Sequence, residues 1–237
     1  MIGTIQGLIY KNKMDKKPDA LFEFIRPHFL EMEGYISAGM QEGKDDTKIF
    51  LNANENPYTL PGLEHYNRYP EPQPPKLLNA MADLYGIQPD QLMISRGADE
   101  AISLIINLFI EPHKDDVLLN PPTFGVYKVD TQIMPARNIV NVPLIKSQGT
   151  YSLDIKSISA ALNEPDNNIK LIFLTNPNNP TGNSFPQSDV LEICNMAKGK
   201  AVVILDETYA EFMPQPSMTK HLSDIPHLVI LRTLSKS

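Results

Sequence analysis

The chain has 237 residues, of which 42% are hydrophobic and 21% charged, a composition typical of a globular protein large enough to bury a substantial core. Its net charge of −7, without a basic run, argues against a nucleic-acid partner, and no apolar run approaches the roughly 20 residues that cross a bilayer. The single cysteine, Cys194, excludes an intrachain disulfide and indicates a reducing, cytoplasmic location, while the five histidines fall at no metal-ligand spacing.

The N-terminal stretch has little periodicity. Residues 1–17 carry four lysines in their second half, and we expect a disordered leader or a misassigned start, with Met14 as the alternative initiator. A targeting peptide is disfavoured by Asp15 and by the lack of a convincing apolar core. Residues 21–24 predict a short helix, after which the chain continues as an extended arm; the whole arm is expected to cover residues 18–60.

The next predicted elements are helix, strand and helix. Residues 76–85 have the apolar spacing of a helix closed by Gly86. Residues 93–95 predict a strand, which a glycine turn connects to a helix containing residues 101–106. The amides of Ala98, Asp99 and Glu100 at that helix start would form an anion site, although the two acids are also ordinary for a helix start.

Alternating strands and helices continue along the chain. Residues 117–119 predict a strand, and the region between Ile139 and Leu162 predicts a strand, a loop at residues 147–149 and a helix capped by Asp154. A further helix is expected between Pro186 and Gly199. This alternation predicts an α/β fold with a doubly wound, mostly parallel sheet and right-handed crossovers.

Three buried strands then end in polar groups. Residues 169–174 lead into TNPNNPTG at 175–182, residues 201–205 lead into DETY at 206–209, and residues 228–232 lead into TLSKS at 233–237. The carboxyl ends of parallel strands are where open α/β sheets bind ligands. The lysine in the last motif, Lys236, could be desolvated there and act as an amine nucleophile; the alternative is a solvated lysine.

An amide, a carboxylate with a phenol, and an amine at one sheet edge are the groups that pyridoxal 5'-phosphate requires. The order Asn-Pro-Thr-Gly, Asp-Glu-x-Tyr, Ser-Lys resembles fold-type I aminotransferases that use this cofactor. The finer resemblance is to the histidinol-phosphate aminotransferase family. It rests on LNANENPY at 51–58, RYPE at 68–71, RGADE at 96–100 and RTLSK at 232–236.

The resemblance implies a role for each cofactor-binding residue. Lys236 would be the catalytic residue, attaching the cofactor and later moving a proton, and Asp206 would pair with the pyridine nitrogen. Phe124, where the family usually has tyrosine, would stack on the ring, and a packing role was the alternative. The remaining contacts would come from Asn179 and Tyr209 to the phenolic oxygen, and from Ala98, Asp99, Glu100, Thr233 and Ser235 to the phosphate.

Further roles implied by the resemblance involve the arm and a second subunit. Tyr69 would reach the cofactor phosphate of the partner subunit, which makes a homodimer the expected assembly. Tyr35 would line the substrate site, with simple packing as a nearly equal alternative, and Asn54 would lie at the site entrance. Tyr127 is expected to pack within its own helix.

The implied reaction exchanges an amino group between L-histidinol phosphate and 2-oxoglutarate in L-histidine biosynthesis. The alternatives are a lyase similar to threonine-phosphate decarboxylase, and an inactive fragment. Family members continue for well over 100 residues beyond the position of Ser237 and there form a small domain. We therefore expect residues 61–237 to be an incomplete cofactor-binding large domain, poorly stable and inactive by itself.

Overall fold

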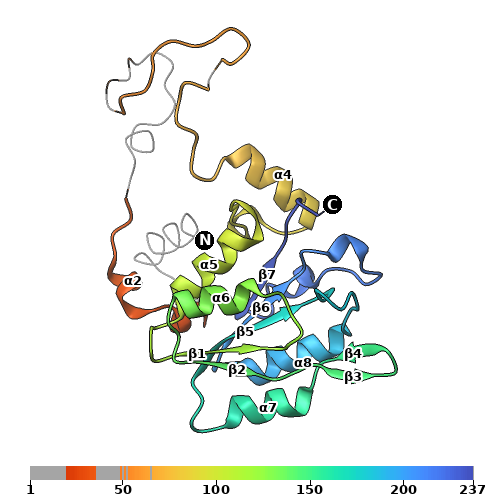
Figure 1. Cartoon of the computed structure of the whole chain (residues 1–237). Coiled ribbons are helices and arrows are strands. Elements are labelled where there is room, and N and C mark those ends of the chain that lie inside the picture. The colour runs from red at the N-terminus through yellow and green to blue at the C-terminus, as the bar shows by residue number, and fades with distance from the viewer. Residues whose placement is uncertain (1–19, 36–48, 50, 52, 65, 237) are drawn as a thin grey trace. The chain divides into compact units, whose positions relative to one another are not determined.

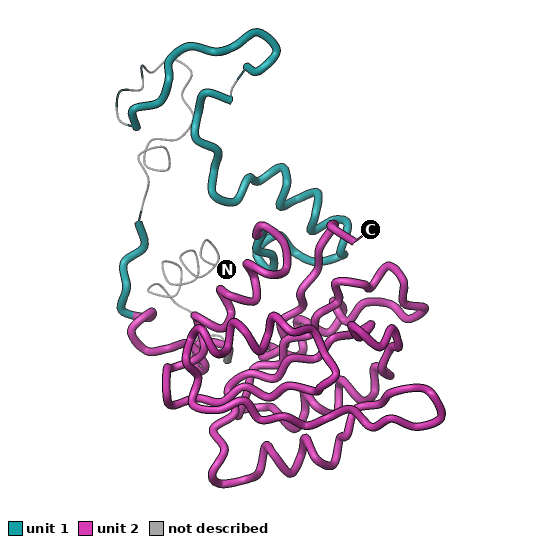
Figure 2. Tube along the Cα trace, viewed as in Figure 1, with its two compact units in different colours: residues 1–15, 31–94 teal, residues 16–30, 95–237 magenta. Residues whose placement is uncertain are grey.

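A computed structural model describes residues 20–35, 49, 51, 53–64 and 66–236. The expected leader at 1–17 and most of the expected arm glycine segment, residues 36–39, lie outside the described residues. The chain divides into two compact units, residues 1–15 with 31–94 and residues 16–30 with 95–237 (Figure 2). The domain boundaries expected from the sequence stay predictions.

The larger unit is built around a five-stranded sheet with the strand order β2-β1-β5-β6-β7. The strands are β1 (Asp116–Leu119), β2 (Asn138–Asn141), β5 (Ile169–Thr175), β6 (Val202–Asp206) and β7 (Leu228–Leu231). Every neighbouring pair is parallel, as the sequence predicted. In the register, Thr175 lies opposite Asp206 and Asp206 opposite Leu231, so three strands end at one level.

Helices cover both faces of this sheet. Figure 1 shows α5 (Gly97–Phe109) and α6 (Val126–Ile133) on one face, and α7 (Ile155–Asn163) and α8 (Gln187–Ala197) on the other. Both faces of β5 and β6 are therefore buried, which explains why these strands are unbroken apolar runs rather than alternating ones. The three-layer, doubly wound fold expected from the sequence is confirmed.

Local capping explains where the helices begin. Asp154 precedes α7, and its Oδ1 accepts a hydrogen bond from the Ser157 amide at 3.0 Å, as predicted. Near the N-terminus the short helix is a 3-10 helix, η1 (Ala20–Phe24), and Pro27 begins a further short helix, α2 (Pro27–Glu31), where an extended arm was expected. Proline favours the first position of a helix, because the missing N–H has no intrahelical partner there.

One hairpin was missed. The antiparallel strands β3 (Ile145–Ser147) and β4 (Thr150–Ser152) flank the predicted loop, and they pair through Lys146 and Tyr151. Gln148 and Gly149 at the turn have φ values of +49° and +80°, a conformation that suits a tight hairpin. These strands are short and mostly exposed, so they lack the apolar alternation by which strands are predicted.

The smaller unit contains α4 (Pro75–Tyr85) and the 3-10 helix η2 (Pro89–Gln91). Gly86 closes α4 in the left-handed conformation, as predicted. The strand predicted at residues 93–95 is wrong, because the Gln73 side chain takes the place of a neighbouring strand. Its Oε1 accepts from the Ile94 N–H, and its Nε2 donates to the Ile94 carbonyl, both at 2.8 Å.

Candidate active site

A cavity of about 280 Å³ lies at the carboxyl end of the sheet, within the larger unit. Its volume is close to the lower end of the roughly 300–1,000 Å³ found for small-molecule sites. The residues predicted from the sequence that line it come from the start of α5 and from the segments that follow β1, β5, β6 and β7: Ala98, Asp99, Phe124, Asn179, Asp206, Tyr209, Thr233, Ser235 and Lys236.

Asp206, the last residue of β6, presents a carboxylate with a donor on each oxygen. Its Oδ1 accepts from the Thr208 N–H at 2.9 Å, and its Oδ2 accepts from the Tyr127 hydroxyl at 2.5 Å. Only 3% of the residue is exposed, yet it lines the cavity. Each carboxylate oxygen has two acceptor sites, so each can take a further donor from a ligand.

Tyr127 is the residue that the sequence analysis undervalued. It packs within α6 as expected, but its hydroxyl also bonds Thr175 Oγ1 at 3.0 Å and reaches Asp206 across 79 residues of sequence. Burial, and next the charge of Asp206, hold the pKa of the Tyr127 hydroxyl far above its usual range. No pattern in the sequence signals this contact, because it joins two residues that lie far apart along the chain.

The segment after β5 is a rigid turn fixed by asparagine side chains. Asn178 Nδ2 donates to the Pro122 carbonyl at 3.0 Å and to Thr181 Oγ1 at 2.8 Å, which joins the loops that follow β1 and β5. Gly182 continues the turn with φ of +74°, and its N–H donates to the Asn178 carbonyl at 2.7 Å. Asn179 is thereby held at the cavity wall.

The segment after β7 supplies hydroxyl groups and an amine. Thr233 is buried, and its Oγ1 accepts from the Ser235 N–H at 3.2 Å and lies 3.0 Å from the Ser235 hydroxyl. Lys236 lines the cavity but is exposed, so the burial expected from its position near a strand end is not found in the structure.

Glu207, next to Asp206, is a second buried carboxylate that sequence analysis assigned no role. It does not line the cavity; instead it accepts from the Met218 N–H at 2.9 Å and the Ser217 hydroxyl at 2.5 Å. Arg232 Nη1 lies 3.5 Å from its Oε2, which joins the ends of β6 and β7. Burial raises the pKa of the Glu207 carboxyl, more than these hydrogen bonds and Arg232 lower it.

The N-terminus of α5 offers main-chain donors to the cavity. No side chain caps it, and Gly97 turns into it with φ of +84°. Ala98 and Asp99 line the cavity, whereas Glu100 does not. The Glu100 carboxylate instead accepts from the Arg96 N–H at 2.5 Å and pairs with its guanidinium, and these contacts lower the pKa of Glu100.

Three predicted residues belong to the other compact unit. Tyr35 is 85% exposed and Tyr69 is 77% exposed, and Asn54 has a φ of +53°. The Tyr69 N–H donates to Glu55 Oε1 at 2.6 Å, and Arg68 forms an ion pair with the same carboxylate. These contacts tie the backbone of Tyr69 and the side chain of Arg68 to Glu55.

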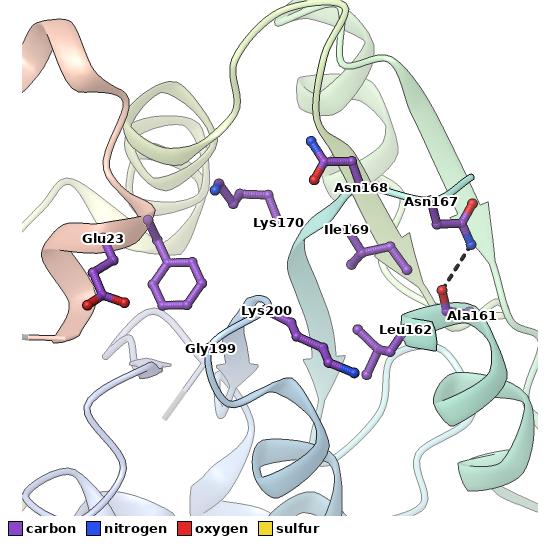
Figure 3. Close-up of a pocket in the computed structure, with 10 residues that line it drawn as sticks. Glu23, Ala161, Leu162, Asn167, Asn168, Ile169, Lys170, Gly199 and Lys200 are labelled. Atoms are coloured by element: carbon purple, nitrogen blue, oxygen red, sulfur yellow. Dashed lines mark hydrogen bonds between the residues drawn. The ribbon is translucent and has the colours of Figure 1, made fainter. Parts of the chain in front are cut away.

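A larger hollow, of about 400 Å³, lies at the amino ends of β5 and β6 (Figure 3). Two of its polar side chains are bonded to other parts of the protein: Lys200 Nζ donates to Asn163 Oδ1 at 2.7 Å, and Asn167 Nδ2 donates to the Ala161 carbonyl at 3.0 Å. None of its lining residues carries a hydroxyl group, whereas Thr175, Thr208, Tyr209, Thr233 and Ser235 line the other cavity. Because parallel sheets bind ligands at the carboxyl ends of their strands, the smaller cavity is the candidate active site.

The described residues contain neither a metal-binding cluster nor a membrane-spanning helix. Within 20–35, 49, 51, 53–64 and 66–236, no group of three or more His, Cys, Asp or Glu side chains could hold a metal ion. In the same part of the chain, no helix is both long and apolar enough to span a bilayer.

Residues 48–237 match the family described as aminotransferase class I and II. The histidinol-phosphate aminotransferase of Buchnera aphidicola subsp. Schizaphis graminum is 40% identical over 215 residues, which are 90% of this chain and 58% of that protein. The Pectobacterium carotovorum enzyme of the same name is 41% identical over 219 residues, with coverages of 91% and 58%. The chain thus spans less than two thirds of the length of these curated relatives.

Solved structures show the same fold. The histidinol-phosphate aminotransferase from Sinorhizobium meliloti, in complex with pyridoxal-5'-phosphate, aligns with a TM-score of 0.60 at 24% identity, over 71% of this chain and 44% of that chain. The N-succinyldiaminopimelate aminotransferase from Mycobacterium tuberculosis aligns with a TM-score of 0.54 at 28% identity, over 60% and 38%.

Proposed function

The chain belongs to the class I and II aminotransferase family, and on that premise we propose that it binds pyridoxal 5'-phosphate in the cavity at the carboxyl end of its sheet. We further propose that it serves amino-group exchange between L-histidinol phosphate and 2-oxoglutarate. The observation that carries the proposal is the placement of Asp206 and Lys236 in one cavity, together with the names of the relatives at about 40% identity.

The residues present fit this cofactor. A protonated pyridine nitrogen needs an acceptor, and the Asp206 carboxylate has free acceptor capacity beside the cavity. A phosphate needs N–H and hydroxyl donors, which the α5 start and Ser235 supply. Thr208 also lines the cavity, and its hydroxyl is buried without a hydrogen-bond partner among the described residues.

Each residue would have a distinct role when the cofactor is bound. The cofactor supplies an electron sink that allows an amino group to leave one carbon skeleton and enter another. Lys236 Nζ would hold the cofactor covalently and, once free, carry a proton from the α-carbon of the substrate. Phe124 would support the ring, and Asn179 and Tyr209 would donate to its phenolic oxygen. Thr233 and the Ala98 and Asp99 amides would orient the phosphate with Ser235.

A homodimer is part of the proposal. Support comes from the smaller unit, where large apolar side chains are exposed, as expected for a surface that meets a partner: Tyr58, Leu60, Leu63, Tyr66 and Tyr69. Tyr69 would then contact the cofactor phosphate of the partner subunit, and Tyr35 and Asn54 would belong to the substrate entrance. A cytoplasmic location is proposed with the activity, and the free thiol of Cys194 is compatible with it.

Borohydride trapping tests the cofactor site. The chain is mixed with pyridoxal phosphate, its visible absorbance is recorded, and the reduced adduct is located by peptide mass spectrometry. We expect the adduct on Lys236 and its loss in Lys236→Ala, with Lys200→Ala as the control, because Lys200 lines only the other hollow. An adduct spread equally over exposed lysines would contradict the proposal.

The substrate is tested with the chain to which pyridoxal phosphate is bound. Histidinol phosphate should deplete the visible band of the covalently held cofactor, and 2-oxoglutarate should restore it, whereas histidinol without phosphate should act weakly. Release of carbon dioxide from O-phosphothreonine would instead indicate the lyase. A band that no amine donor changes would indicate a chain that binds cofactor without turnover.

A further inference from the structure

Tyr127 is fully buried and does not line the cavity, so it cannot contact a ligand there directly. Its hydroxyl nevertheless bonds the carboxylate that is proposed to meet the cofactor ring, at 2.5 Å from Asp206 Oδ2. A buried phenol whose single hydroxyl proton is donated to this carboxylate can affect the site only through Asp206.

The orientation of the Asp206 carboxylate depends on having a partner on each side. The terminal torsion of an aspartate is broad, so an unsupported carboxylate does not hold one plane. Here the Thr208 N–H fixes Oδ1 at 2.9 Å and the Tyr127 hydroxyl fixes Oδ2. Removing either donor would let the plane turn, and it would leave a buried oxygen short of a hydrogen bond.

Tyr127 is itself held firmly. Its ring stacks on Phe173 with centroids 4.6 Å apart, and it meets the edge of Phe124 at 5.6 Å. Its hydroxyl also bonds Thr175 Oγ1 at 3.0 Å. Burial, and next the charge of Asp206, raise the pKa of this hydroxyl far above its usual range, so the phenol keeps its proton at neutral pH and can donate it to Asp206.

We propose that Tyr127 is a positioning residue, whose hydroxyl fixes the plane of the Asp206 carboxylate that receives the pyridine N–H of the cofactor. This inference rests on the proposed function. It adds to the site a residue that lies behind the cavity wall, where its ring stacks on Phe173 and its hydroxyl bonds Thr175.

The test compares two ligands that differ only at the ring nitrogen. Calorimetry measures the affinity of the chain for pyridoxal phosphate and for its 1-deaza analogue, which has a carbon in place of that nitrogen. The ratio of the two affinities reports the contact of Asp206 with the ring, because the phosphate and amine contacts are shared. The unmodified chain should prefer pyridoxal phosphate, and Tyr127→Phe should reduce this preference about tenfold, the scale of one hydrogen bond to a charged group.

Thr131→Val is the matched control. Thr131 is a buried residue of the same helix, and its hydroxyl donates to the Tyr127 carbonyl at 2.6 Å instead of to Asp206. Its replacement should leave the affinity ratio unchanged. If Tyr127→Phe lowers the affinity for both ligands by the same factor, the role of Tyr127 is purely structural and the inference is overturned. The inference is also overturned if neither affinity changes.

The outcomes separate this inference from the proposed function. A chain that binds neither ligand refutes both, whereas a chain that binds both equally refutes only the role of Asp206 and Tyr127. If Tyr127→Phe does not fold, the unmodified chain labelled with 13Cζ-tyrosine gives a second measurement. The signal of Tyr127 should move more with pyridoxal phosphate than with the deaza analogue, and equal movement overturns the inference.

Discussion

Glu207 offers a sharp test of how the framework behind the site is held. Glu207→Ala removes the acceptor of the Met218 N–H and the Ser217 hydroxyl, and it deprives Arg232 of one carboxylate. Glu207 is fully buried, and an unsatisfied buried donor costs about 1–3 kcal/mol. With the broken ion pair and the space left behind, we expect a loss of roughly 3–5 kcal/mol in the free energy of unfolding.

Glu207→Gln should cost less, about 1–3 kcal/mol, because glutamine fills the space and keeps one acceptor oxygen although it loses the ion pair with Arg232. The two variants differ in pH dependence as well. Burial raises the folded-state pKa of Glu207 above its unfolded value, so the folded chain holds the proton more tightly. This group therefore contributes a fall in stability as the pH rises from its unfolded pKa through its folded pKa.

Urea denaturation followed by circular dichroism, from pH 4 upward, measures both effects. The stability of Glu207→Gln relative to the unmodified chain should rise with pH across that window and then level off. Equal losses in the alanine and glutamine variants would refute the hydrogen-bond argument. A difference between glutamine and glutamate that does not change with pH would refute the argument from burial.

Three other positions test the rest of the larger unit. Ile158 is fully buried in the core between α7 and the sheet, so Ile158→Ala should lower the free energy of unfolding by about 2–5 kcal/mol in urea. Gly182→Ala should lower the free energy of unfolding by about 1 kcal/mol in the same assay, because alanine is strained at a φ of +74°. Crowding is not the cause, since a Cβ there would meet no atom within 4 Å, and an unchanged urea midpoint would contradict the prediction. The Ser157 hydrogen bonds lower the pKa of Asp154. Asp154→Ala should therefore lower the melting temperature at neutral pH, and the difference from the unmodified chain should become smaller as the pH falls through that pKa. A difference that does not change with pH would argue against the cap.

The sheet and its helices could be predicted because each element carries its own local signal. The strands β5 and β6 are uninterrupted apolar runs, and α7 begins at a capping aspartate. The polar groups at the strand ends could be placed in one cavity because parallel strands share an edge. Asp206, Asn179 and Lys236 were expected at one edge on this ground, and all three line the same cavity.

The errors arose where distant residues decide the outcome. Residues 93–95 are apolar enough for a strand, but the Gln73 side chain satisfies the Ile94 backbone from 21 residues away. The contact of Tyr127 with Asp206 joins residues 79 apart, and no periodicity in either segment encodes it. The hairpin of β3 and β4 is exposed, so its only signal was the Gln148-Gly149 turn.

Asp206 and Glu207 are adjacent in sequence, yet one faces the ligand cavity and the other the supporting framework. Successive side chains of an extended strand point to opposite faces, so the loss of one residue within β6 would put the glutamate at the position of Asp206, and the gain of one would put the aspartate at the position of Glu207. Aspartate is too short to reach the partners of glutamate, and glutamate would intrude on the ligand. In evolutionary terms, β6 should tolerate changes of side chain in its apolar positions far better than any change of length, and insertions or deletions in this lineage should be confined to the loops on either side of it.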